Sequence, residues 1–498
     1  MAARGAGAAG QPRAAHRRAH GRGREATLLP YLELFIALFI ALGFAFVNGF
    51  HDTANAVATV IYTRSLTAPV AVVWSGVFNL IGVLLSSGAV AFGIASLMPI
   101  DLILQLGSGA GIPMVFAMLI AAVTWNLGTW YLGLPASSSY TMIGSILGVG
   151  IVNALLSGRE GTSGVDWSKA TDIGYALLLS PVFGFVLAGL LLLAFKFAVR
   201  NSALYAEPRG DQPPPWLVRG ILILTCTSVS LFHGSNDGQK GMNLIMLVLI
   251  GTLPAAYALN RALPPSQMAR LQAAAKAASE VIEQKAFGYN VIGNPRPTVA
   301  LYVTRHEINE GTYPSLAVLA RDIGDEVKQY GSMTRMPEEI ASITRNDMYL
   351  VSEAIRLLIK DKESDLSRDE VAALQAYRSS LDSGTKFIPN WVKIAEAIAL
   401  GLGTMIGWKR IVVTVGERIG KAHLTYAQGA CAENAADGFG LPVSTTHVLS
   451  SGVAGSMAAN GSGLQWRTVR NILLAWVLTL PTAMMISGML YWLFSRLS

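Results

Sequence analysis

Long apolar stretches separated by short polar ones recur along most of the chain. Several exceed about eighteen residues with few or no charges, the length that an α-helix needs to cross the hydrocarbon core of a bilayer. Residues 28–47 form one such stretch, in which Glu33 is the only charge. The stretches lie at roughly 28–50, 67–98, 112–132, 134–157, 172–199, 217–232, 242–260, 390–407, 440–458 and 470–494. This pattern predicts an all-α, polytopic membrane protein with about 10–12 transmembrane or re-entrant helices.

Charged residues concentrate in one block, residues 261–388, where the two signs nearly balance. Apolar and charged residues alternate there at helical spacing, which predicts a soluble, mostly helical insert without assigned chemistry. The insert divides the chain into a first transmembrane repeat (28–199), the start of a second repeat (217–260) and the remainder of that repeat (389–498). Residues 1–27, rich in arginine, alanine and glycine, are expected to form a disordered basic tail.

The two transmembrane halves carry matching polar motifs. "NGFHDTANA" (48–56) and "GLPASSSYT" (133–141) in the first half correspond to "HGSNDGQKG" (233–241) and "GLPVSTTHV" (440–448) in the second. Gly49 and Gly133 lie 84 residues apart, and Gly234 and Gly440 lie 206 apart, so the halves match once the insert is removed. Internal duplication of this kind is typical of transporters built from inverted repeats. The segment 424–439 is shorter than its counterpart, which predicts either a half-helix lining a cavity or a helix damaged by a deletion.

An aspartate lies in the first motif of each half, next to an apolar stretch. At mid-membrane such a side chain costs about 2.5–3.5 kcal/mol, which a cation, a proton or a water-filled path can offset. Asp52 and Asp237 are therefore candidate ligands of a coupling cation or a metal. Gly49 and Gly234, three residues earlier, favour broken helices at both motifs. Helix capping at the level of the lipid headgroups is the structural alternative.

A Gly-Leu-Pro turn precedes a run of hydroxyl side chains in the second motif of each half. Proline favours the first turn of a helix, where free backbone N–H groups and neighbouring hydroxyls can bind an oxyanion. Ordinary capping of two membrane helices is the alternative. The candidate anion ligands are Ser137, Ser138, Ser139, Thr141, Ser444, Thr445 and Thr446.

Basic side chains complete the candidate site. His51, His233 and His447 lie within or beside the motifs and are candidates for proton relay, with a structural hydrogen-bonding role as the alternative for each. Lys240 occupies the position of Asn55 in the first motif. It either neutralises the neighbouring acid or supplies positive charge to an anion.

Composition and spacing argue against several other classes of protein. The net charge of +7 is not accompanied by a basic stripe interleaved with aromatics, so no nucleic-acid partner is expected. The only two cysteines, Cys226 and Cys431, form no metal-binding or disulfide framework. A metal-dependent phosphohydrolase using His51 and Asp52 would need further ligands on nearby helices, and none is apparent. We therefore expect neither an enzyme nor a resident cofactor.

Four stretches resemble the inorganic phosphate transporter (PiT) family: "NGFHDTANAVATVIYTR", "WNLGTWYLGLPASSSYTMIG", "HGSNDGQKGMNLIMLVLIG" and "GLPVSTTHVLSSGVAG". The resemblance runs from about residue 30 to the C-terminus and is loosest in 261–388. It implies a symporter of inorganic phosphate in the cell membrane, the inner membrane for a bacterial protein, with a phosphate site between two inverted repeats. It further implies proton coupling and transport of a neutral complex of a divalent metal with hydrogenphosphate. Sodium coupling, sulfate as substrate and a passive anion channel stay open, and a homo-oligomer is compatible with the resemblance.

Carried over by position, the resemblance implies that Asp52 and Asp237 are the family's aspartates. It implies that Asn55 and Asn236 join the serine and threonine turns in binding phosphate. Members of the family typically have a full apolar helix between "TYAQG" and "GLPVSTTH", whereas this chain is about seven residues shorter there.

Overall fold

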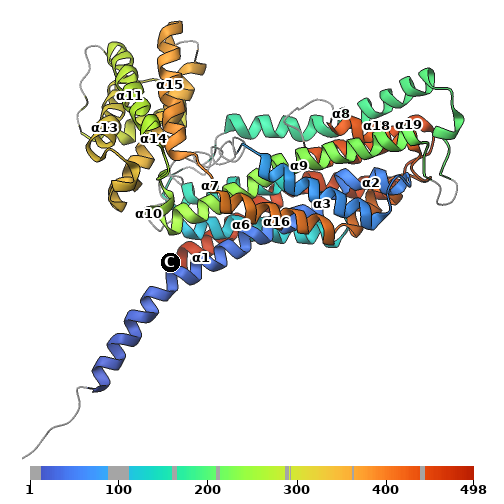
Figure 1. The fold of residues 1–498 in the computed structure, drawn as a ribbon, viewed down its shortest axis with the longest axis horizontal. Helices are drawn as coiled ribbons and strands as arrows, with labels where there is room; N and C mark the ends of the chain where they lie inside the picture. Colours follow the sequence, from blue (N-terminus) through green and yellow to red (C-terminus); the bar gives the residue numbers. More distant parts are fainter. Residues whose placement is uncertain are drawn as a thin grey trace, which may run out of the picture.

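The computed structural model describes residues 13–87, 111–159, 165, 167–208, 213–286, 291, 293–361, 364–437 and 444–497. These residues are predominantly helical (Figure 1). The first half comprises α1 (Arg13–Asp52), α2 (Ala54–Tyr62), α3 (Ala68–Leu85), α6 (Ile112–Tyr131), α7 (Ser138–Leu156), α8 (Trp167–Ala198) and the short 3-10 helix η3 (Ser202–Leu204). The second half comprises α9 (Trp216–Thr252), α10 (Pro254–Tyr257), α16 (Asn390–Ile406), α17 (Lys409–Val413), the π-helix η6 (Thr414–Arg418), α18 (Tyr426–Asp437), α19 (Thr445–Asn460) and α20 (Trp466–Leu497).

Seven helices in the described part of the chain are long and apolar enough to span a membrane. An eighth candidate is the bent pair formed by α16 and residues 409–418, which meet at 49°. The all-α, polytopic membrane class is therefore confirmed. The total of 10–12 helices stays a prediction, because residues 88–110 lie outside the described residues.

The two halves interleave, so long helices of one repeat pack on helices of the other. α1 packs on α16 and α9 packs on α3, while α7 packs on α20 and α19 packs on α8. α1 leads into α2 at one end of the bundle, whereas α9 leads into α10 at the opposite end (Figure 1). The two helices that carry the aspartate motifs thus run in opposite directions, as inverted repeats require.

The expected break in the second aspartate motif is wrong, because α9 continues without interruption from Trp216 to Thr252. In the first motif only Thr53 separates α1 from α2, and its backbone angles of −52° and −36° are helical. The glycines serve close packing instead. A Cβ at Gly49 would overlap the backbone of α16, and a Cβ at Gly234 would overlap the backbone of Asn79. Small residues at such crossings let membrane helices approach closely.

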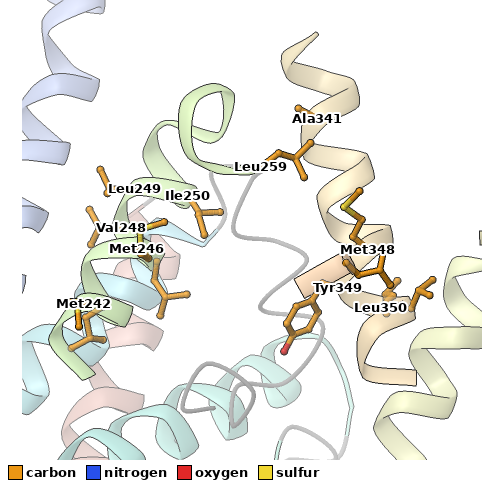
Figure 2. Close-up of a cluster of buried hydrophobic side chains, with 14 of the residues drawn as sticks. Met242, Met246, Val248, Leu249, Ile250, Leu259, Ala341, Met348, Tyr349 and Leu350 are labelled. Carbon is orange, nitrogen blue, oxygen red and sulfur yellow. The ribbon is translucent and has the colours of Figure 1, made fainter. Parts of the chain in front are cut away.

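The insert is a helical bundle at one end of the membrane helices (Figure 1). It comprises α11 (Pro265–Lys285), α12 (Arg296–Arg305), α13 (Thr312–Tyr330), the short 3-10 helix η4 (Met333–Arg335), α14 (Glu338–Lys360) and α15 (Arg368–Thr385). Its apolar core is continuous with that of the membrane helices. Figure 2 shows Met246 and Ile250 on α9, Leu259 after α10 and Met348 on α14 within one buried cluster.

Helix α1 begins at Arg13, inside the segment that was expected to be disordered, and projects beyond the bundle (Figure 1). Alanine and arginine are both strong helix formers, which accounts for the difference at residues 13–27. For residues 1–12, which lie outside the described residues, disorder stays a prediction.

Candidate functional site

Asp52 lies at the end of α1, where hydroxyl groups from both repeats meet it. Ser138 at the start of α7 donates a hydrogen bond to Oδ2 at 2.9 Å. Thr446 at the start of α19 donates to Oδ1 at 2.8 Å. Asn55 donates to the Thr446 hydroxyl at 3.0 Å and lies 3.4 Å from Oδ1 of Asp52. Only 3% of Asp52 is exposed, so these donors replace the water that an exposed carboxylate would bind.

Asp237 has a different set of partners. The Lys240 ammonium lies 2.5 Å from its Oδ1 and also donates to the hydroxyl of Ser139. Lys240 belongs to the next turn of α9, and its side chain is buried. Lys240 therefore neutralises Asp237 and at the same time brings a positive charge to the start of α7. The first role considered for this lysine is therefore observed, and the supply of charge to an anion stays a prediction.

The first residue of each aspartate motif reaches across to the aspartate of the other repeat. Asn48 on α1 donates to Oδ2 of Asp237 at 3.4 Å. At the equivalent position on α9, His233 places its Nε2 3.6 Å from Oδ2 of Asp52 and 3.5 Å from Oδ2 of Asp237. The other ring nitrogen of His233 lies 2.8 Å from Oδ1 of Asn79, which orients the ring.

These contacts obey an approximate twofold relation between the repeats. Asn55 and Lys240 are equivalent in the motifs, and each contacts its own aspartate and a hydroxyl of the turn in the other repeat: Thr446 for Asn55, Ser139 for Lys240. The residues after those hydroxyls, Tyr140 and His447, stack on each other with ring centroids 5.2 Å apart. The two halves of the site therefore meet inside the bundle, where both aspartates and most of the hydroxyl side chains of the two turns are buried.

The two aspartates and His233 could together hold a cation. Each of Asp52, His233 and Asp237 offers one ligand atom, and these atoms all lie within 4.8 Å of one another. Carboxylate oxygens and an imidazole nitrogen suit several divalent metals. Nε2 of His233 has no hydrogen-bond partner among the described residues, which leaves it available to a proton or a metal.

The two hydroxyl-rich turns begin helices, as the sequence predicted. Ser137 is the N-cap of α7, and its side chain makes no capping hydrogen bond, so the first-turn N–H groups of α7 are not capped by it. Ser444 is the N-cap of α19 and accepts from the N–H of His447 at 3.4 Å. The Thr445 hydroxyl accepts from Asn55 at 3.5 Å. The Gly-Leu-Pro turn before α7 is described, whereas residues 440–442 lie outside the described residues.

Four of the residues that the sequence singled out do not join the hydrogen bonds to the two aspartates described above. Asn236 is exposed, because on a helix it points about 100° away from its neighbour Asp237. Thr141 donates to the carbonyl of Ser137 within its own helix. His51 contacts the Thr129 hydroxyl at 3.1 Å, with its Nδ1 3.7 Å from the Asp52 carboxylate. His447 stacks between Tyr140 and Trp476, and neither of its ring nitrogens has a hydrogen-bond partner among the described residues.

Sequence reasoning missed three polar residues of this region. Asn48 was inside the first motif, and its alignment with His233 could have indicated it. Asn79 lies within the apolar stretch 67–98 and was given no role there, yet it orients His233. Glu396 is fully buried on α16, and the signal available for it was an acid within an apolar stretch.

Comparisons with known proteins find relatives along almost the whole chain. The profile of the family described as the phosphate transporter family matches residues 48–487. The low-affinity inorganic phosphate transporter PitA of Escherichia coli (strain K12) is 41% identical over 486 residues, covering 93% of this chain and 96% of PitA. PitB of the same strain is 39% identical over 486 residues, again covering 93% of this chain and 96% of the relative. The probable low-affinity inorganic phosphate transporter of Bacillus subtilis (strain 168) is 27% identical over 476 residues, covering 94% and 99%.

A solved structure of a protein named as the sodium-dependent phosphate transporter has a TM-score of 0.48 to this chain and 18% sequence identity. The match covers 94% of this chain and 100% of that one.

Proposed function

This chain belongs to the phosphate transporter family, and we propose that it is a secondary active symporter that carries inorganic phosphate together with protons. The family profile matches residues 48–487. The relatives above are named as phosphate transporters, and the alignments cover almost their whole length. The interleaved inverted repeats support alternating access, in which one repeat rocks against the other around a central site. Location in the bacterial inner membrane stays a prediction, and the sequence leaves the oligomeric state open.

Phosphate binds, in this proposal, between the starts of α7 and α19. The uncapped N-terminus of α7 offers free N–H groups to an oxyanion, and the positive end of the helix dipole favours a negative charge there. Ser137, Ser138 and Ser139 contribute hydroxyls from α7, and Ser444, Thr445 and Thr446 contribute them from α19. The Lys240 ammonium, already bonded to Ser139, supplies the positive charge. Asn55 orients the α19 side through Thr446.

One observation carries the choice of the proton as the coupling ion. Where the first motif has the neutral residues Asn48 and Asn55, the second has the bases His233 and Lys240, and each base contacts an aspartate. Lys240 is a resident cation at Asp237, so that acid needs no second mobile cation. One proton on His233, between Asp52 and Asp237, then balances the remaining buried acid.

A divalent metal that travels with phosphate is the second candidate. The three ligand atoms of Asp52, His233 and Asp237 are close enough to hold such an ion beside the hydroxyl turns. The metal would then be cargo, carried as a complex with hydrogenphosphate. Removing divalent metals with a chelator distinguishes the two, because only transport of the complex depends on them.

The test is uptake of radiolabelled phosphate by the full-length protein in proteoliposomes. We expect uptake to follow an inward proton gradient, to be unaffected by replacing sodium with choline, and to resist an excess of sulfate. Uptake that requires sodium would overturn the proton coupling. Phosphate flux that is unchanged when every ion gradient is collapsed would indicate a channel. Competition by sulfate would indicate that the site also accepts sulfate.

Lys240→Asn makes the second motif match the first at this position and tests the resident cation. Sodium-free uptake should fall at least about tenfold, because Asp237 loses a partner 2.5 Å away and a buried acid without its partner is strongly disfavoured. Measurement with and without sodium shows whether an external cation can replace the ammonium. Wild-type uptake by this variant in the absence of sodium would contradict the role of Lys240.

A further inference from the structure

Glu396 is a buried acid that the phosphate site does not use. It lies on α16 with none of its surface exposed, and neither carboxyl oxygen has a hydrogen-bond partner among the described residues. Leaving an ionised carboxylate unpaired in a protein interior costs several kcal/mol. An acid in this position is stable only with a proton on it or a cation beside it.

A glycine on α9 makes room for this carboxyl group. A Cβ at Gly241 would overlap both oxygens of Glu396, so the carboxyl group packs directly against the α9 backbone. His233, Asp237 and Gly241 are spaced four residues apart along α9, and therefore lie on one face of that helix. The step from Asp237 to Gly241 is one turn, about 6 Å along the axis. Glu396 thus continues the row of ionisable groups that begins with His233 and Asp237.

The row leads toward the end of the bundle that carries the insert. α16 begins at Asn390, directly after the insert, and Glu396 is about 9 Å along it from that start. Between them, Lys393 donates to the carbonyl of Ser86 just beyond the end of α3 at 3.0 Å. Glu396 therefore lies between the central cluster and the insert side of the membrane.

Few other charged groups lie near Glu396. α3, which packs on α16, carries no charged or titratable side chain. On the other neighbours, the titratable or charged residues whose side chains are described are Tyr31, Glu33, His51 and Asp52 on α1, and Arg219, Cys226, His233, Asp237 and Lys240 on α9. Helix α16 itself carries Lys393, which donates to the carbonyl of Ser86. Of these, Asp237 and Lys240 belong to the turn of α9 that precedes Gly241. Glu396 therefore faces the end of the central cluster that Asp237 and Lys240 form.

We propose that Glu396 is a proton-transfer residue of the transport cycle, linking the central cluster to the insert side of the membrane. Its carboxyl group takes up a proton from the side of the central cluster and releases it to water on the insert side, or carries a proton the opposite way. The proposal rests on the proton coupling proposed above. The proposal predicts different effects on two modes of transport, net uptake and exchange. Net uptake of phosphate with protons needs the proton to leave, whereas exchange of internal for external phosphate does not.

The test compares these two modes for Glu396→Gln in proteoliposomes. Net uptake driven by a proton gradient should fall about tenfold or more, whereas exchange at equal phosphate concentrations should stay within about twofold of wild type. Glu396→Asp keeps the carboxyl group and should retain part of the net uptake. Glu33→Gln, which changes an acid on α1 away from this row, is the matched control and should behave as wild type in both modes.

Infrared spectroscopy provides a readout that a purely structural role would not move. The carbonyl band of a buried protonated carboxyl group should be present in the wild type and absent in Glu396→Gln. Wild-type net uptake by Glu396→Gln would overturn the proposal. So would an equal loss of exchange and of net uptake in folded Glu396→Gln and Glu396→Asp. An infrared carbonyl band in Glu396→Gln that is the same as in the wild type would overturn it as well. If the wild type exchanges phosphate but ignores the proton gradient, the proposed coupling itself fails, and the two failures are thereby distinguished.

Discussion

Thr446 offers the sharpest test of the hydroxyl turns. Its hydroxyl donates to Asp52 at 2.8 Å and accepts from Asn55 at 3.0 Å, and the side chain is buried. Thr446→Val keeps the shape and removes the hydroxyl that makes these two hydrogen bonds. Asp52 then loses one of the two hydroxyl donors described above, and only 3% of Asp52 is exposed to water that could replace it.

The size of the effect follows from the charge of the acceptor. A hydrogen bond to a charged group contributes about 1.5–3 kcal/mol. Since about 1.4 kcal/mol corresponds to a factor of ten, kcat/KM for phosphate uptake should fall about 10- to 150-fold. The measurement is the initial rate of uptake into proteoliposomes over a range of phosphate concentrations, normalised to the amount of folded transporter.

Thr141→Val is the matched control. The Thr141 hydroxyl donates to the carbonyl of Ser137 in its own helix at 3.1 Å, and the equivalent residue of the second repeat is already Val448. Uptake by this variant should stay within about twofold of wild type. The reasoning is refuted if Thr446→Val transports like the wild type, or if the two variants lose activity equally.

Three further predictions concern the stability of the fold. Gly234→Ala should lower it by about 1–3 kcal/mol, because the added methyl group overlaps the backbone of Asn79. Gly220→Ala on the same helix meets nothing within 4 Å and serves as the control in thermal unfolding of the detergent-solubilised protein, where equal losses would refute the packing argument. Ser367→Ala should destabilise the start of α15 by about 1 kcal/mol, because it removes one half of a capping box, and faster amide exchange there would report it. Hydrogen bonds from the backbone and side chain of Ser367 lower the pKa of Glu370 below its usual 4.5. The ionised Glu370 therefore contributes fully to the stability of α15 above pH 4.5, and this contribution is lost as the pH falls through the folded-state pKa. If the amide protection of the first turn of α15 does not decrease as the pH is lowered, this role of Glu370 is contradicted.

Much of the site could be anticipated from the duplicated motifs. Asp52 and Asp237 were identified because acids are rare beside membrane-length apolar stretches, and the structure brings both to His233. The hydroxyl turns were identified because proline and serine favour helix starts. The glycines were misread as breaks, because glycine both interrupts helices and permits close packing, and a sequence without its neighbours does not distinguish the two.

The sequence by itself determined the class of the protein, the duplication and the residue types of the site. Bilayer thickness sets the length of apolar helices. Because burying an acid in the membrane is energetically costly, Asp52 and Asp237 could be identified as site residues from the sequence. Only the tertiary structure decided which hydroxyls meet Asp52, that Asn236 faces outward, and that Glu396 packs against Gly241 without a partner among the described residues. These depend on how each helix is rotated about its axis and which helix of the other repeat it contacts. Spacing within a single helix carries no information about either.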